Sequence, residues 1–302
     1  MKKLLLVLGT ALAVFSAQAR ENITIIYGFS PADSSANYSR SLAEEANRIQ
    51  DKYNFMFDAK PGGGQVIAAN YVRNTPNTMF MTSGVFWVRP TVFPNDSYDY
   101  TKYRTVMTQC LAPFAVGSMK YRSFRDVPRD QRTTIAVSGL GVISHLAAIQ
   151  IQQTYPQMDI VPYKSTAEAV TGVVSGQVDF VVGFVGDIER FAAQGMNLLG
   201  TTGTATVGAH KTLVSQGLHA SLGKMSTPYN LMVPDSWSAE KAAEVRKILV
   251  RAENTRSVRE SYAVDNCFPF QVPENKLNSW WDEQRQYWTD LASRVKVNQW
   301  PI

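Results

Sequence analysis

A short loop at residues 138–144 contains the side chains best suited to binding a small ligand. Ser138, Gly139 and Gly141 follow a β-branched run, and Ser144 precedes apolar residues at helical spacing. The glycines allow the backbone to turn sharply and to approach a ligand closely. With Ser144 as the N-cap, the free N–H groups of the first helical turn point back at the loop. This geometry predicts an anion-binding site.

The elements that position this loop alternate between strand and helix. Strands are predicted at residues 134–137, 160–163 and 178–182. One helix is predicted to begin near Ser144, and a second after the sequence STAE at 165–168, which has the form of a capping box. Alternation of this kind predicts a parallel sheet.

The same residues give little support to enzymatic chemistry. The spacing Gly139-x-Gly141-x-x-Ser144 comes close to a dinucleotide-binding fingerprint, but Ser144 replaces the third glycine. Asp159 lies at the start of the second strand, whereas a ribose-binding acid stands at its end. The histidines have no metal-binding spacing, and a general-base role for His145 is an unsupported alternative. The sequence therefore predicts no enzyme, no cofactor and no metal site.

Two segments of the chain carry a family resemblance. SGLGVISHLA at 138–147 and VPYKSTAEAVTGVVSGQVD at 161–179 closely resemble the substrate-binding proteins of tripartite tricarboxylate transporters, often called Bug-type receptors. The family has a serine-glycine loop, a helix-capping hydroxyl and a His-Leu pair where this chain has the first segment. Val142 replaces a second hydroxyl that the family commonly has after the last loop glycine.

The first loop of the mature chain also resembles the family. It follows Phe29, between a strand predicted at 23–29 and a helix predicted at 39–49. Where the family has a Gly-Gly pair, a hydroxyl pair and an Asp, this chain has the sequence ADSSA at 32–36, so that the hydroxyl pair matches while Ala32, Asp33 and Ala36 differ. Asp33 either adds negative charge beside the expected carboxylate site, or it caps the helix or forms a hydrogen bond with its own backbone.

Further candidates follow two other strands. Ser83 ends a strand predicted at 79–83, at the edge where open α/β sheets place their ligands. Phe86 and Trp87 form either an aromatic wall of the site or ordinary core. Asp187 either meets a ligand cation or begins a helix.

The resemblance implies an α/β, two-domain periplasmic-binding-protein (type II) fold with two crossover strands and a ligand cleft between the domains. Segments at 113–119 and 228–233 are predicted to be the crossover strands. The expected first domain comprises residues 20–117 and 230–302, and the second comprises residues 118–229. Such a topology permits hinge closure over a ligand.

The N-terminus predicts export. A basic start, an apolar run and the small-x-small sequence Ala17-Gln18-Ala19 indicate a signal peptide over residues 1–19, and hence a periplasmic protein. No later run is apolar enough for a membrane span, so we expect a soluble product. The net charge of +5 is too weak and dispersed to indicate nucleic-acid binding. Cys110 and Cys267 either pair or remain buried thiols.

The resemblance implies capture of a small carboxylated solute, such as a dicarboxylate, tricarboxylate, amino acid or aromatic acid, and its delivery by a monomer to membrane permease subunits. The alternative is a ligand sensor that acts on a receptor kinase. The predicted ligand-binding residues are Phe29, Ser30, Ser34, Ser35, Ser83, Ser138, Gly139, Gly141, Ser144, His145, Tyr163 and Asp187.

Overall fold

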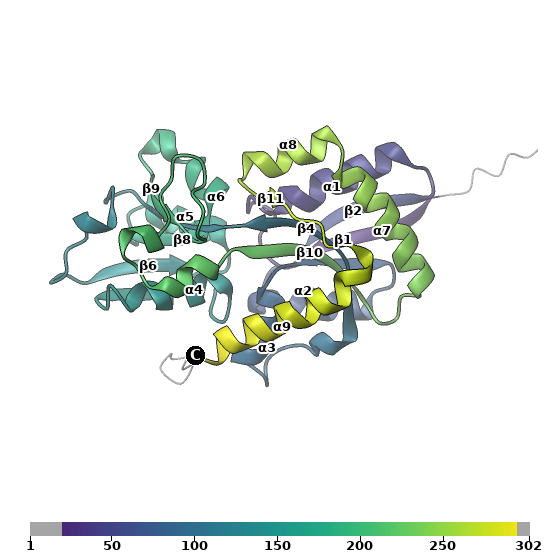
Figure 1. Cartoon of the computed structure of the whole chain (residues 1–302), viewed down its shortest axis with the longest axis horizontal. Helices are drawn as coiled ribbons and strands as arrows, with labels where there is room; N and C mark the ends of the chain where they lie inside the picture. Colours follow the sequence, from purple (N-terminus) through teal and green to yellow (C-terminus); the bar gives the residue numbers. More distant parts are fainter. Residues whose placement is uncertain (1–19, 295–302) are drawn as a thin grey trace, which may run out of the picture.

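The computed structural model describes residues 20–294, so the predicted signal peptide lies outside the described residues. Two sheets lie side by side along the long axis of the molecule, each covered by helices (Figure 1). We call each sheet with its helices a half. Within the described range, no helix combines the length and the apolar composition that a membrane crossing requires.

The first half is built on a six-stranded sheet of order β11-β4-β10-β3-β1-β2. β1 is parallel to β2 and β3, whereas β10 is antiparallel to β3 and β4. Its strands are β1 (Glu21–Tyr27), β2 (Tyr53–Ala59), β3 (Thr78–Thr82), β4 (Tyr103–Ala112), β10 (Thr227–Pro234) and β11 (Phe268–Pro269). Its helices are α1 (Ala36–Ile49), α2 (Val66–Asn74), α3 (Val85–Val92), α7 (Ala239–Glu253), α8 (Arg256–Val264) and α9 (Leu277–Ser293). In Figure 1, α1, α7 and α8 lie on one side of this sheet, and α2, α3 and α9 lie on the other.

The second half is built on a five-stranded sheet of order β7-β6-β8-β5-β9. Its strands are β5 (Phe114–Ser118), β6 (Thr133–Val137), β7 (Met158–Pro162), β8 (Phe180–Phe184) and β9 (Asn197–Thr201). Its helices are α4 (Ile143–Gln152), α5 (Thr166–Val174) and α6 (Val185–Glu189). The parallel arrangement predicted for β6, β7 and β8 is confirmed, but the sheet is mixed because β5 runs antiparallel to β8 and β9.

Side chains of β6 point alternately to the two faces of the second sheet, where α4 covers one face and α5 covers the other. Ile135 and Val137 belong to the core cluster that contains Leu146 of α4, whereas Ala136 packs in a second cluster with Val170 of α5. Since successive strand residues point to opposite faces, the short apolar run is buried on both sides.

Two strands connect the halves. β4 leads through Pro113 into β5, and β10 returns to the first sheet, where it pairs with β4 from Thr227 to Pro234. α9 adds a third connection, because it packs on α3 while Tyr287 donates a hydrogen bond of 2.6 Å to the Lys224 carbonyl oxygen. The crossover strands expected at 113–119 and 228–233 are thus present as β5 and β10.

Phe86 and Trp87 belong to the core of the first half and not to a ligand site. Both side chains are fully buried in α3, where Trp87 packs edge-on against Trp280 and Trp281 of α9. The aromatic stripe of α9 therefore covers α3, as is usual for an amphipathic helix.

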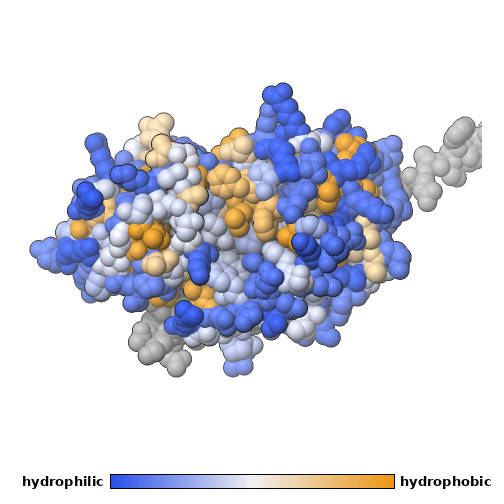
Figure 2. All heavy atoms as spheres, viewed as in Figure 1, coloured by the Kyte–Doolittle hydropathy of each residue, from blue (hydrophilic) through white to orange (hydrophobic). Residues whose placement is uncertain are grey.

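The surface of the molecule is largely hydrophilic, with apolar residues grouped near the middle of the face shown in Figure 2.

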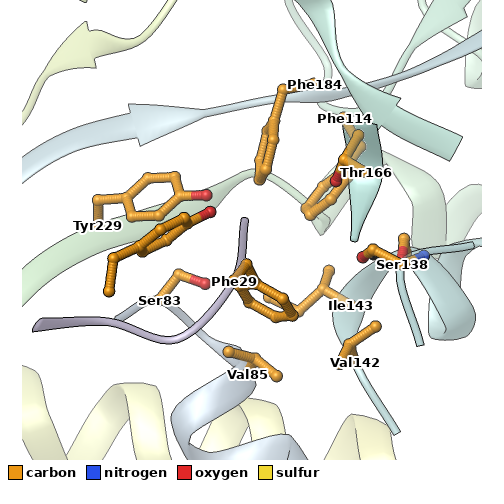
Figure 3. A pocket seen from close by; sticks show the side chains of 12 residues that line it. Phe29, Ser83, Val85, Phe114, Ser138, Val142, Ile143, Thr166, Phe184 and Tyr229 are labelled. Carbon is orange, nitrogen blue, oxygen red and sulfur yellow. Dashed lines mark hydrogen bonds between the residues drawn. The ribbon is translucent and has the colours of Figure 1, made fainter. Parts of the chain in front are cut away.

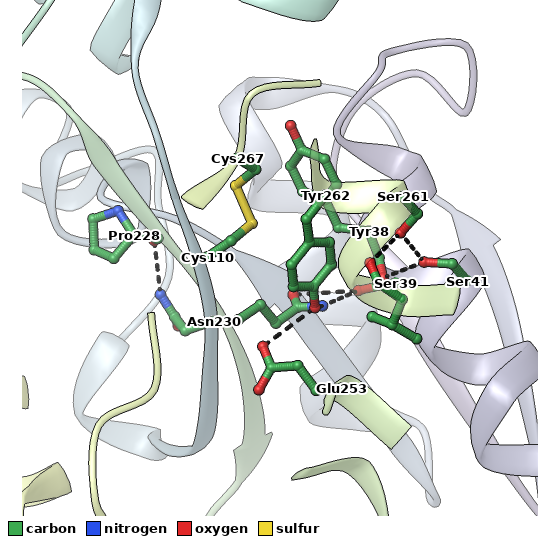
Figure 4. The surroundings of a disulfide bond; sticks show 12 residues. Tyr38, Ser39, Ser41, Cys110, Pro228, Asn230, Glu253, Ser261, Tyr262 and Cys267 are labelled. Atoms are coloured by element: carbon green, nitrogen blue, oxygen red, sulfur yellow. Dashed lines mark hydrogen bonds between the residues drawn. A yellow bond between two sulfur atoms is a disulfide. The ribbon is translucent and has the colours of Figure 1, made fainter. Parts of the chain in front are cut away.

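Cys110 and Cys267 form a disulfide (Figure 4). It joins β4 to the segment between α8 and β11, across a sequence separation of 157 residues. Tyr262 lies nearby and donates a hydrogen bond of 3.3 Å to the buried Glu253 carboxylate. Of the two alternatives that the sequence left open, the structure has the paired cysteines.

Candidate binding site

A small cavity, partly open to solvent, lies where the two halves meet. Its volume is about 20 Å³, which is room for about one water molecule. The cavity is lined by Tyr27, Phe29, Ser83, Val85, Phe114, Ser138, Val142, Ile143, Ser144, Thr166, Phe184 and Tyr229. This volume is far below that of small-molecule pockets, so the walls must move apart to admit a ligand.

Many of these residues lie at or just after the carboxyl ends of parallel strands. Phe29 and Ser83 follow β1 and β3 in the first half, and Ser138 and Phe184 lie at the ends of β6 and β8 in the second half. The carboxyl ends of the parallel strands of both sheets therefore face one cavity, as open α/β sheets generally place their ligands. Tyr229 comes from the crossover strand β10.

Hydroxyl groups lie at two sides of the cavity (Figure 3). Ser138 and Thr166 come from the second half, and Tyr229 and Ser83 come from the first. The rings of Phe184, Phe114 and Phe29 lie between these groups in Figure 3. The cavity thus has an apolar middle with polar groups at each side.

Ser144 is not the N-cap that the sequence predicted. α4 begins at Ile143, and its capping position is Val142, two residues before Ser144, with no side-chain cap. The Ser144 hydroxyl accepts a hydrogen bond of 3.1 Å from the Ser138 N–H and lies 2.9 Å from the Ser138 hydroxyl. It therefore fixes the end of β6 against the first turn of α4. The cap predicted for α5 is confirmed, because Ser165 accepts from the Glu168 N–H at 3.2 Å.

Three helices begin at the cavity. Val85, Ile143 and Thr166 are the first residues of α3, α4 and α5, and all three line it. The first turn of a helix carries N–H groups without intrahelical partners and a partial positive charge. No lysine or arginine side chain is among the residues that line this cavity in the described chain. Negative charge in the cavity would therefore be stabilised by helix ends and hydroxyls.

Gly139 and Gly141 shape the loop without lining the cavity. Their φ angles are +140° and +67°, which side chains of L-residues rarely adopt. A Cβ at Gly141 would lie 2.6 Å from the Phe93 ring. His145 accepts a hydrogen bond of 3.1 Å from the Gly141 N–H, and burial lowers its pKa to about 4. His145 is therefore a neutral part of the loop structure at neutral pH.

The serines of the first loop lie behind the cavity wall. The Ser35 hydroxyl is 2.6 Å from the hydroxyl of Tyr27, and Tyr27 is a residue that lines the cavity. Ser30 accepts a hydrogen bond of 3.2 Å from the Ala32 N–H, and the Ser34 N–H is directed at the second half. Like these residues, Tyr163 does not line the cavity, because its hydroxyl lies against Gly172 of α5.

Two buried aspartates join the halves. Asp33 accepts a hydrogen bond of 3.0 Å from the Ala167 N–H in the first turn of α5. Asp187 accepts one of 2.8 Å from the Ser34 N–H and one of 2.9 Å from Arg190. Burial raises the pKa of Asp33 to about 7 and raises the pKa of Asp187, and the negative charge of Asp187 adds to the shift of Asp33.

These contacts differ from the expectations for both residues. Asp187 lies inside α6 and neither begins the helix nor faces the cavity, because its carboxylate is used to hold the first loop. Asp33 bonds to the opposite half and not only to its own loop. Arg190 strengthens the same junction by donating to the Ala32 carbonyl oxygen at 3.2 Å.

Sequence patterns did not identify several of the residues that line the cavity. Thr166 opens a predicted helix, and Phe184 lies two residues after the strand predicted at 178–182. Both therefore lie near strand ends, where ligands were expected. Three other lining residues lie in strands, and from the sequence alone they resemble ordinary core residues: Tyr27, Phe114 and Tyr229. No pattern in the sequence separates them from ordinary buried aromatics.

No family model and no curated protein matches the sequence. Solved structures do resemble it. The periplasmic binding protein BugD has a TM-score of 0.79 at 16% identity, covering 90% of this chain and 96% of that chain. Rpa4515 of R. palustris with adipate has a TM-score of 0.80 at 16% identity, covering 91% and 97%. MatC (Rpa3494) from Rhodopseudomonas palustris with bound malate has a TM-score of 0.78 at 15% identity, covering 90% and 99%.

These likenesses extend over nearly the whole described chain and over nearly the whole of each solved chain. The resemblance expected from the loop sequences is therefore confirmed in the fold. The chain has the two-domain α/β fold of these periplasmic binding proteins, with two crossover strands and a cavity between its halves.

Proposed function

We propose that this chain is an extracytoplasmic solute receptor, which encloses a small carboxylated solute between its halves and releases it unchanged. The observation that carries this proposal is the convergence of α3, α4 and α5 on one cavity that both halves line. Helix N-termini supply N–H donors and positive potential, which suit a carboxylate in a site without cationic side chains.

The hydroxyls of the lining support the same ligand class. Because the Ser138 and Ser144 hydroxyls bond to each other, one of these two and the Thr166 hydroxyl can donate to a carboxylate oxygen from the second half. Hydrogen bonds to a charged group are stronger than those between neutral groups. The solved structures of the same fold with adipate and with malate add support by analogy.

A role in transport follows from the same argument. A site between two halves suits capture and release, and among the described residues that line it no nucleophile is paired with a base. The loop resemblance supports delivery by a monomer in the periplasm to the permease subunits of a tripartite tricarboxylate transporter.

A thermal-shift experiment on the mature protein tests the proposal. The probes are butanoate, hexanoate, benzoate, succinate, adipate and malate, with butanamide, hexanamide and benzamide as neutral controls. We expect at least one acid to raise the melting temperature well above its amide, since a ligand at 100 times its Kd stabilises by about 2.7 kcal/mol. The acid should be recovered chemically unchanged. Equal effects of acids and amides, or a converted acid, would contradict the proposal.

A further inference from the structure

We propose that the cavity selects a solute with one carboxylate and an apolar body, and that Asp33 excludes a second carboxylate. This inference rests on the proposed function and narrows its ligand class. The two polar sides of the cavity differ. One is formed by the first turns of helices in the second half, and the other is formed by tyrosines near buried acidic residues.

The side formed by the second half suits an anion. The hydroxyl of Ser144, in the first turn of α4, lies 2.9 Å from that of Ser138 after β6, and Thr166 begins α5. Hydroxyls and helix starts there meet in one place and both stabilise negative charge. The carboxylate of the solute is assigned to this side.

The middle of the cavity suits an apolar body. The Phe114 and Phe184 rings pack with their centroids 4.6 Å apart, and Phe29, Val85 and Ile143 line the same space. An unpaired carboxylate placed against such a wall would lose its hydration without compensation. The ligand is therefore apolar beyond its first carboxylate.

The side formed by the tyrosines disfavours a second anion. Tyr27 lines the cavity, and its hydroxyl lies 3.4 Å from an Asp33 carboxylate oxygen, so Asp33 lies directly behind a lining residue. Asp187 adds negative potential at both Tyr27 and Tyr229. Both aspartates are deeply buried, where charges interact more strongly than in water.

The nearby cations do not offset this potential for a ligand. Arg190 is paired with Asp187 and bonded to the Ala32 carbonyl oxygen. Arg89 is paired with Asp96 and donates to the Leu140 carbonyl oxygen. Neither arginine lines the cavity. The solved neighbours with adipate and malate hold dicarboxylates, so this chain is predicted to differ from them in selectivity.

Calorimetric titration of matched acids tests the inference. Hexanoate is compared with adipate and butanoate with succinate at pH 8, where Asp33 is ionised because its pKa is about 7. We expect each monocarboxylate to bind at least about tenfold more tightly than the dicarboxylate of equal length, since like charges a few ångströms apart repel more strongly in a protein than in water.

Asp33→Asn assigns the selectivity to its source. The amide oxygen still accepts from the Ala167 N–H, while the charge is lost. We expect the hexanoate-to-adipate preference to fall several-fold. Asp159→Asn is the control, because it removes one exposed negative charge near the start of β7, at the other end of the strands from the cavity. This control should leave the preference unchanged.

The outcomes separate this inference from the proposed function. Adipate or succinate binding as tightly as its monocarboxylate would overturn the inference and leave the proposed function standing. Failure of every acid to bind would overturn both. An unchanged preference in Asp33→Asn would remove Asp33 as the cause, and the wild-type titrations decide the selectivity even if that variant does not fold.

Discussion

The Ser144 hydroxyl does two things at the residue scale. It accepts from the buried Ser138 N–H, and it lines the ligand cavity. Ser144→Ala should therefore lower the free energy of unfolding by about 1 to 3 kcal/mol, because a buried donor loses its acceptor. It should also weaken the binding of hexanoate by about tenfold, as expected for a lost hydrogen bond to a charged ligand. Urea unfolding and calorimetry measure the two effects.

Ser238→Ala is the matched control for Ser144→Ala. Ser238 caps α7 by accepting from the Lys241 N–H at 3.1 Å, and it does not line the cavity. Its loss should cost about 1 kcal/mol of stability and leave the affinity unchanged. Unchanged affinity in Ser144→Ala as well would show that the anion is held by backbone N–H groups alone.

Gly141 is predicted to be intolerant of any side chain. It combines a φ of +67° with a Cβ position 2.6 Å from the Phe93 ring. Gly208 has a similar φ of +56°, but a Cβ there would meet nothing within 4 Å. Gly208→Ala should cost about 1 kcal/mol from backbone strain alone. Gly141→Ala should cost clearly more in urea unfolding, and equal losses would show that the Phe93 contact relaxes freely.

The sequence predicted the site best where a residue follows a parallel strand. Phe29, Ser83, Ser138 and Ser144 were found in this way and line the cavity. Asp187 was misread because its partner, the Ser34 N–H, is 153 positions away in the chain. Contacts of this kind depend on how the two halves meet, which local patterns do not encode.

At the scale of elements, the junction between the first loop and the helices α5 and α6 should make closure depend on pH. Burial in the closed form raises the pKa of Asp33 from an ordinary 3.8 to about 7. Asp187, Asp265 and Glu189 are the other acids at this junction, and Arg190 is its cation. The closed form therefore holds a proton that an open, hydrated form would release.

The sign of the effect follows from linkage. A raised pKa favours the closed form at low pH, and this advantage is lost as the pH rises through about 7. The affinity for hexanoate should fall between pH 6 and pH 8, by less than about tenfold per pH unit for one proton. His145 stays neutral in this range because its pKa is about 4. A flat profile in the wild type, or an equally steep one in Asp33→Asn, would contradict this account.

The disulfide is an element-scale feature of the first half. Replacing both Cys110 and Cys267 by serine should lower the stability by about 2 to 5 kcal/mol, because the unfolded chain regains the freedom that the cross-link removes. Neither residue lines the cavity, so the affinity for hexanoate should not change. A reductant should lower the melting temperature of the wild type and leave the double variant unaffected. Equal responses to the reductant would show that the cysteines are not paired in solution.

At the scale of the whole molecule, the strand and helix pattern together with the loop resemblance predicted the fold. The parallel strands β1, β2 and β3 and β6, β7 and β8 carried clear β-branched or aromatic runs. β9 and β11 were missed, since a short edge strand has little pattern of its own. Both sheets are mixed because the crossover strands β10 and β5 run antiparallel to their neighbours in the first and the second sheet.

The central claim is that the two halves close on a carboxylate. We propose that they move as the two domains expected from the sequence, residues 20–117 with 230–302 and residues 118–229. The direct bonds between Asp33 and Ala167 and between Asp187 and Ser34 correspond to a closed form. Small-angle scattering of the mature protein, with and without an acid shown by thermal shift to be saturating, tests this claim most directly. The account predicts a smaller radius of gyration with the acid. An identical radius of gyration with and without saturating acid would contradict it.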